Sequence, residues 1–149
     1  MDKLRLPPDF KEFLQLLNLE KVEYLLVGGL AVGVYGYPRA TGDMDIWVAA
    51  TPDNAEKLAR VMVAFGFSAA TIQAETFERP EQVIRMGVPP ICIDLITSAT
   101  GVHFIECYAR RIPTTIDGIV ISVIHADDLK ANKKASGRAK DINDLENLP

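Results

Sequence analysis

The stretch Gly42-Asp43-Met44-Asp45-Ile46-Trp47-Val48 contains two aspartates one residue apart, and an apolar run follows them at once. The apolar run, residues 46–50, predicts a β-strand with the two acids at its mouth. Side chains alternate between the faces of a strand, so Asp43 and Asp45 point to the same side. Two carboxylates this close repel each other, and a cation between them resolves the conflict. Hard oxygen ligands of this kind suit Mg²⁺ or Mn²⁺.

The composition is that of one globular domain. The chain has 149 residues, 48% of them apolar and 24% charged, which predicts a single domain over residues 1–149. No apolar stretch approaches the roughly 20 residues that a membrane helix needs. Residues 1–10 hold charges and two prolines and show no signal-peptide core. We therefore expect a cytoplasmic protein without a membrane partner, in which Cys92 and Cys107 are reduced core thiols.

The charge distribution limits the kind of partner. The net charge of −4 argues against a protein that coats nucleic acid by bulk electrostatics. Residues 130–140 nevertheless hold five basic side chains and no acid. Such a run is typical of a solvated helix face, and the alternative is a local phosphate site. Any contact with RNA is then short and local, near Arg138.

Apolar periodicity predicts helices and strands that alternate along the chain. Thr51 followed by Pro52 is typical of a helix start, and Asp117-Gly118 is a strong hairpin signal. The interleaved pattern predicts an α/β (α+β) fold with a mixed β-sheet and helices packed on it. Helices are expected at residues 10–17, 30–35, 52–65, 102–110, 126–135 and 140–148, with a short helical turn in 75–82. Strands are expected at residues 24–27, 44–50, 67–72, 83–86, 91–96, 112–116 and 119–123.

A third carboxylate, Asp94, lies inside the apolar run of residues 91–96. A buried and unpaired carboxylate is costly, so Asp94 needs a cation, an arginine or a set of N–H donors. If its strand neighbours the strand of Asp43 and Asp45, three carboxylates converge. Divalent ions bridged by such a set are a general solution for in-line nucleotidyl transfer.

The pair Gly28-Gly29 follows the strand at residues 24–27. Glycine lets the backbone approach a ligand closely, and a helix that opens there directs free N–H groups at an anion such as phosphate. The spacing is neither the dinucleotide-binding fingerprint nor a P-loop. A plain strand-to-helix turn is the alternative.

The order of strand, Gly28-Gly29, short helix and two aspartates, with Asp94 downstream, resembles the nucleotidyltransferase superfamily of the DNA polymerase β type. The resemblance is close to minimal nucleotidyltransferase-like proteins related to the toxin of the AbiE abortive-infection system (AbiEii-type). Two further stretches resemble that branch, Gly87-Val88-Pro89-Pro90 to Asp94-Leu95-Ile96, and the closing segment from Asp128-Leu129 through Gly137-Arg138 to Asp144-Leu145.

The resemblance implies a role for each candidate residue. Asp43, Asp45 and Asp94 are expected to hold Mg²⁺ or Mn²⁺, and Asp94 is also a candidate proton acceptor. The alternative for Asp94 is a paired strand carboxylate, and an ion pair with Asp141 or Asp144 is expected for Lys140. The residues expected at the nucleotide are Gly28, Gly29, Arg39, Thr41, Lys133 and Arg138.

The implied activity is transfer of a nucleoside monophosphate from an NTP to a hydroxyl or phosphate acceptor. The acceptor is an RNA 3′ end such as that of tRNA, a partner protein or a small molecule, and kinship suggests a toxin–antitoxin setting. The chain has no room for the extra acceptor-binding domain of larger relatives, so the acceptor is expected to bind on the core itself, on a second copy of the chain or through a partner protein, such as a small helical one. The alternatives are a non-catalytic nucleotide-binding or antitoxin subunit and a metal-dependent phosphohydrolase.

Overall fold

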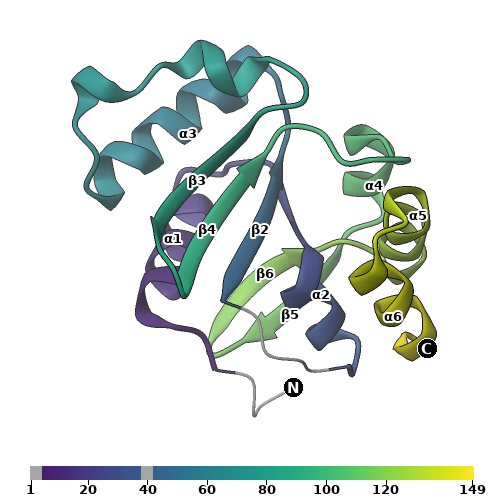
Figure 1. The fold of residues 1–149 in the computed structure, drawn as a ribbon. Coiled ribbons are helices and arrows are strands. Elements are labelled where there is room, and N and C mark those ends of the chain that lie inside the picture. Colours follow the sequence, from purple (N-terminus) through teal and green to yellow (C-terminus); the bar gives the residue numbers. More distant parts are fainter. Residues whose placement is uncertain (1–4, 38–41) are drawn as a thin grey trace.

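A six-stranded mixed sheet forms the centre of the protein (Figure 1), for which a computed structural model describes residues 5–37 and 42–149. The strand order is β3-β4-β2-β1-β6-β5. Two neighbouring pairs, β2–β4 and β1–β6, are parallel, and the other three pairs are antiparallel. The strands are β1 (Tyr24–Val27), β2 (Asp43–Val48), β3 (Val83–Val88), β4 (Ile91–Ile96), β5 (Ile112–Ile116) and β6 (Ile119–Val123).

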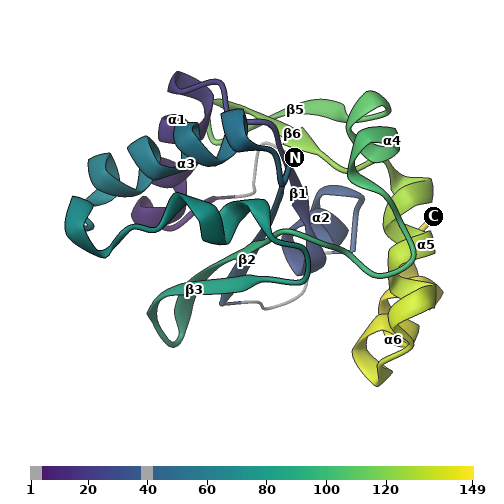
Figure 2. The same ribbon diagram turned by 90° about the horizontal axis from the view of Figure 1, so that it is seen from above.

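Helices cover the sheet from two sides. Helices α1 and α3 pack against each other, while α4, α5 and α6 gather on the far side of the molecule from them (Figures 1 and 2). No helix within residues 5–37 and 42–149 combines the length and apolar character needed to cross a bilayer. The α-helices are α1 (Pro8–Leu19), α2 (Gly28–Val34), α3 (Pro52–Phe65), α4 (Phe104–Ala109), α5 (Ala126–Ser136) and α6 (Ala139–Asn147).

The core explains why the central strands read as apolar runs. All four residues of β1 are buried between β2 and β6, because helices cover both faces of the sheet there. Trp47 of β2 is 1% exposed and packs edge-to-face on Phe104, with ring centroids 5.2 Å apart. The half of β2 that follows Asp45 is thus anchored in the core, which fixes the acids at its start.

The predicted mixed sheet with packed helices is confirmed, and so are its local signals. Thr51 caps α3 by accepting a hydrogen bond from the backbone N–H of Asn54. Asp117 and Gly118 both have positive φ and join β5 to β6 in a two-residue turn, as this dipeptide favours. Both thiols are buried and free, and burial raises the pKa of Cys107 to about 11.

The predicted strand at residues 67–72 is wrong, because Ala69–Thr71 forms a short 3₁₀ helix. Ser68 starts this helix by accepting hydrogen bonds from the Ala70 N–H and, through its carbonyl, from the Thr71 hydroxyl. Serine and threonine commonly draw the backbone into such turns. The predicted turn in residues 75–82 is present as a second 3₁₀ helix, Ala74–Glu78.

Asn54 joins the start of α3 to the ends of both central strands. Its side chain is 2% exposed, accepts the Glu23 N–H at 2.8 Å, and donates to the carbonyls of Glu23 and Ala49 at 3.1 and 3.0 Å. The Glu23 N–H and the Ala49 carbonyl therefore bond to this amide, while the Glu23 carbonyl also accepts the Ala49 N–H at 3.2 Å.

We expect Asn54→Ala to lower the free energy of unfolding by about 2–3 kcal/mol, because it leaves buried backbone groups unpaired. Urea unfolding monitored by circular dichroism measures this loss. Asn147→Ala, which removes an exposed amide on α6, is the control and is expected to change stability by less than about 0.5 kcal/mol. Equal effects of the two substitutions would contradict this account.

Candidate functional site

Three charged residues form one row across three neighbouring strands. Asp45 of β2 lies opposite Asp94 of β4 in the parallel pair, and Asp94 lies opposite Arg85 of β3 in the antiparallel pair. Residues in register on adjacent strands point to the same face of the sheet. Asp43, two residues before Asp45, shares that face. The sheet thus brings the three predicted carboxylates together, with an arginine at their edge.

Arg85 binds Asp94 through both prongs of its guanidinium. Its Nε donates to Oδ1 at 2.9 Å and its terminal nitrogen donates to Oδ2 at 2.9 Å. The same terminal nitrogen lies 3.4 Å from Oδ2 of Asp43. Bidentate pairs of this kind are among the stronger hydrogen-bonded ion pairs. Arg85 therefore neutralises Asp94 and reaches toward a second acid.

Asp45 is the carboxylate with the least favourable surroundings. Burial raises its pKa to about 6, and the negative charges of Asp94 and Asp43 raise it further, against the weaker opposing effect of Lys140 and Lys133. The ionised form of Asp45 is therefore destabilised in the protein alone. A cation placed beside it would relieve this cost.

Gly28 is required by its closeness to Asp45. Its φ is +70°, and a Cβ at this position would overlap Oδ2 of Asp45. Only glycine adopts this conformation freely and leaves room for the carboxylate. Gly28 thus lets the backbone approach the Asp45 carboxylate, and the predicted approach to a phosphate stays a prediction; Gly29 is buried inside α2.

A cleft of about 480 Å³ opens beside Asp45 and Gly28. Its volume lies within the usual range for small-molecule sites. One wall comes from the sheet and the other from α5 and the start of α6. The polar residues that line it are Asp45, Ser98, Thr100, Asn132, Lys133, Ser136 and Arg138.

A buried ionic cluster fixes the far wall of this cleft. Lys133, 3% exposed, lies 3.2 Å from Asp141 and 3.0 Å from Asp144. Arg138 also binds Asp141, with Nε 2.7 Å from Oδ2. Burial alone would raise the pKa of Asp141, but hydrogen bonds from Arg138 and Lys133 hold it below its ordinary value. The acids that the sequence assigned to Lys140 are thus bound by Lys133.

The predicted metal site fits only in part. Carboxylate oxygens suit Mg²⁺ or Mn²⁺, and the unfavourable charge on Asp45 is what a cation beside Asp43 and Asp45 would offset. Both oxygens of Asp94, however, already accept hydrogen bonds from Arg85. Among residues 5–37 and 42–149, no group of three or more acidic, histidine or cysteine side chains is arranged to hold a metal. The metal site stays a prediction.

The predicted residues divide into four sets. The sheet brings Asp43, Asp45 and Asp94 together, and the cleft brings Gly28, Lys133 and Arg138 to its edge. Gly29 is buried within α2 and is not one of the residues that line the cleft. Arg39 and Thr41 fall outside the described residues.

Sequence reasoning missed Arg85, although the sequence contains a signal for it. Pro89 and Pro90 form the two-residue connection between β3 and β4, so Val88 pairs with Ile91. Counting outward from that pair sets Arg85 opposite Asp94. Hairpin register alone thus identifies the arginine, which was one of the three partners expected for this carboxylate.

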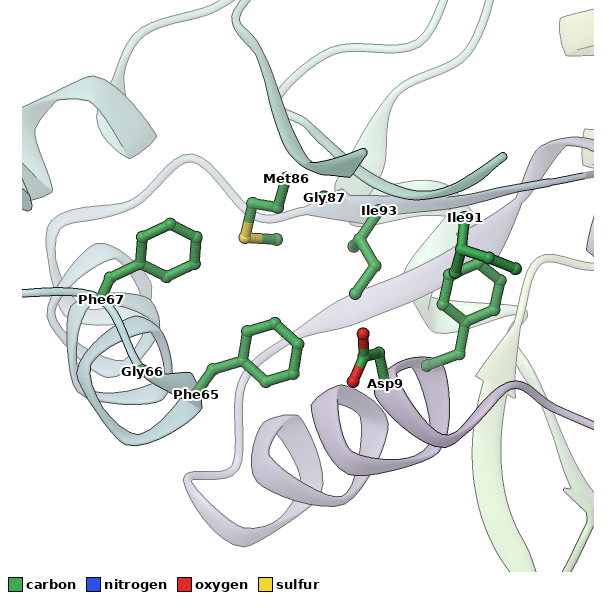
Figure 3. A pocket seen from close by; sticks show the side chains of 9 residues that line it. Asp9, Phe65, Gly66, Phe67, Met86, Gly87, Ile91 and Ile93 are labelled. Carbon is green, nitrogen blue, oxygen red and sulfur yellow. The ribbon is translucent and has the colours of Figure 1, made fainter. Parts of the chain in front are cut away.

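An apolar pocket of about 250 Å³ lies on the opposite face of the sheet (Figure 3). Met86 and Ile93, which line it, alternate along their strands with Arg85 and Asp94. Asp9 is the one charged side chain among its lining residues. Because the described residues that line this pocket include no basic or hydroxyl side chain, we do not assign the candidate site to it.

We expect Asp45→Asn to stabilise the protein at neutral pH. The pKa of Asp45 is raised from 3.8 to about 6, so the folded chain retains a proton that the unfolded chain releases. Stability therefore falls as pH rises through that window, and the loss persists above it. Asp45→Asn should be more stable by up to about 3 kcal/mol at pH 7.5 and no more stable at pH 3.5. Urea unfolding measured across this pH range tests the prediction, with Asp53→Asn, a substitution of an exposed acid, as the control. A gain in the free energy of unfolding that does not change with pH would contradict it.

We expect Gly28→Ala to cost about 2–4 kcal/mol, from backbone strain and from overlap with Asp45. Gly36 also has positive φ but has no atom within 4 Å of an added Cβ. Gly36→Ala should therefore cost only about 1–2 kcal/mol. In an Asp45→Ala background, which removes the two nearest atoms and leaves the Cβ of residue 45 at 3.1 Å, the excess cost at Gly28 should fall by more than half, as a double-mutant cycle by urea unfolding would show. An unchanged excess would mean that Asp45 is not the obstacle.

No protein-family model matches the sequence, and no curated protein matches it either. The fold has a solved counterpart in the crystal structure of a "putative nucleotidyltransferase" from Thermotoga maritima. The two structures superpose with a TM-score of 0.65 over 97% of this chain and 95% of the other, at 14% sequence identity. Likeness at this identity concerns the fold alone. The chain therefore has a nucleotidyltransferase-like fold.

Proposed function

We propose that this protein is a metal-dependent nucleotidyltransferase that moves a nucleoside monophosphate from an NTP to a hydroxyl or phosphate acceptor. One observation carries the proposal: Asp45 and Asp94 stand side by side in the parallel pair β2–β4, with Asp43 on the same face. The adjoining cleft is large enough for a small-molecule ligand and has basic residues on its far wall. The fold of the Thermotoga maritima structure supports the same class.

In this proposal the acidic residues bind the metal and the basic residues bind the phosphates. Asp43 and Asp45, together with Asp94 when Arg85 does not occupy it, would hold Mg²⁺ or Mn²⁺, which would supply positive charge to the triphosphate and lower the pKa of an attacking hydroxyl. Gly28 has no side chain beside Asp45, so a phosphate can approach the backbone there. Lys133 contributes a fixed positive charge, and the guanidinium of Arg138, 61% exposed, can turn toward a phosphate. A proton-acceptor role for Asp94 belongs to the same proposal.

The setting of the reaction is also proposed. Two buried free thiols suit a reducing cytoplasm, where NTPs are available. The acceptor we propose is a short RNA 3′ end or a partner protein, in a system of the AbiEii toxin–antitoxin type. We also propose that a second copy or a small helical protein contributes to the surface that binds the acceptor.

A labelling experiment tests the proposal. The purified chain, Mg²⁺ and each of four α-³²P-labelled NTPs are incubated with total RNA or with total protein from a lysate. We expect label to appear in one acceptor class and pyrophosphate to be released. Asp43→Ala with Asp45→Ala should reduce labelling at least about a hundredfold, since electrostatic groups at a reacting centre contribute on this scale. EDTA should abolish it.

Matched controls separate this outcome from others. Asp53 and Asp127 are both exposed acids outside the site, so the double variant Asp53→Ala, Asp127→Ala has the same charge change and should label normally. Labelling that survives the loss of Asp43 and Asp45 would refute the proposal. NTP binding without pyrophosphate release would favour a non-catalytic nucleotide-binding subunit. Steady phosphate release without an acceptor would favour a phosphohydrolase.

A further inference from the structure

The ion pair between Arg85 and Asp94 connects two side chains with very different access to water. The side chain of Asp94 is 10% exposed, and that of Arg85 is 52% exposed. An arginine with this exposure can leave its partner for solvent or for another anion. Asp94 cannot follow it into water, and a buried carboxylate without a partner is costly. Asp94 therefore requires a partner at all times, but the structure does not require that partner to be Arg85.

Arg85 and a divalent ion would compete for the same oxygens. The guanidinium uses both oxygens of Asp94 and reaches Asp43 as well. A divalent ion shared by these two carboxylates would lie in the space that the guanidinium fills, and two cations there repel each other. Binding of a metal to Asp94 thus depends on the departure of Arg85.

The strand that carries Arg85 also borders the cleft. Val83 lines the cleft, and Arg85 lies two residues further along β3 on the same face. A guanidinium released from Asp94 therefore starts about 7 Å along the strand from the wall that Val83 forms, a distance that an arginine side chain can span. Its planar fork matches phosphate oxygens in the way it matches a carboxylate.

We propose that Arg85 is an internal counter-ion that occupies Asp94 until metal and nucleotide bind, and that it then transfers to the triphosphate. This inference rests on the proposed function and assigns Arg85 a place in it. Arg85 makes metal binding weaker in the protein alone and nucleotide binding tighter in the presence of metal. Metal and nucleotide consequently bind with positive coupling, each improving the affinity for the other.

Arg85→Gln tests the proposal, with Arg79→Gln as a control of equal charge change on an exposed residue just before β3. Binding of Mn²⁺ alone is measured by the loss of its free electron paramagnetic resonance signal. Binding of radiolabelled α,β-methylene nucleoside triphosphates at saturating Mn²⁺ is measured by equilibrium dialysis. Arg85→Gln should bind Mn²⁺ about tenfold more tightly than wild type and the analogue at least about fivefold more weakly, as expected for coupling of usual size. Arg79→Gln should match wild type in both.

The opposite signs distinguish this role from a structural one, since a damaged site would lose both affinities. Arg85→Lys keeps the charge but lacks the planar fork, so it should bind Mn²⁺ with an affinity between those of wild type and Arg85→Gln. This variant replaces Arg85→Gln in the test if Arg85→Gln does not fold. Mn²⁺ affinity of Arg85→Gln equal to or below that of Arg79→Gln would overturn the inference. Asp45→Asn separates the two proposals: if it weakens Mn²⁺ binding while Arg85→Gln changes nothing, the counter-ion role fails alone. If wild type binds no Mn²⁺ at all, both fail.

Discussion

The parallel pairing of β2 with β4 is the constraint on which the site depends. Its register sets Asp45 directly beside Asp94, so two negative charges share a partly enclosed position. The sheet cannot separate them without breaking its hydrogen bonds, because β2 is anchored in the core beyond the acids. The rest of the site then consists of ways to offset that charge. Arg85 does so from the edge strand, and Lys133 and Lys140 do so at longer range from the C-terminal helices.

Local sequence patterns were sufficient to predict the structure wherever it is determined by residues that are close in the sequence. The alternation around Asp43 and Asp45 gave their common face, and Asp117-Gly118 gave the hairpin between β5 and β6. Residues 67–72 misled because their apolar character suited a strand, whereas the serine at position 68 draws the backbone into a 3₁₀ turn. Competition of this kind is settled by hydrogen bonds that apolar periodicity does not reveal.

The partners of charged residues were harder to predict, since they depend on how distant elements meet. The sequence showed that Asp94 needed a partner but left open which one, and the hairpin register selected Arg85. Likewise, Lys133 rather than Lys140 binds Asp141 and Asp144, because the packing of α5 on α6 turns position 133 inward. Buried ion pairs of this type contribute little net stability and more to a defined arrangement. Which charged residues pair with each other therefore depends on how the helices and strands pack and cannot be inferred from composition.

The cluster around Lys133 also determines how a ligand would meet positive charge in the cleft. A lysine held by two buried acids has already lost its rotamer freedom, so a bound anion need not order it. The exposed guanidinium of Arg138, in contrast, can adapt its position to the ligand. The wall of the cleft thus contains one lysine held in place by two acids and one arginine whose guanidinium is accessible to solvent. If a polyphosphate binds in this cleft, as we propose, the solvent-accessible Arg138 rather than the enclosed Lys133 is the group that can adjust to its shape.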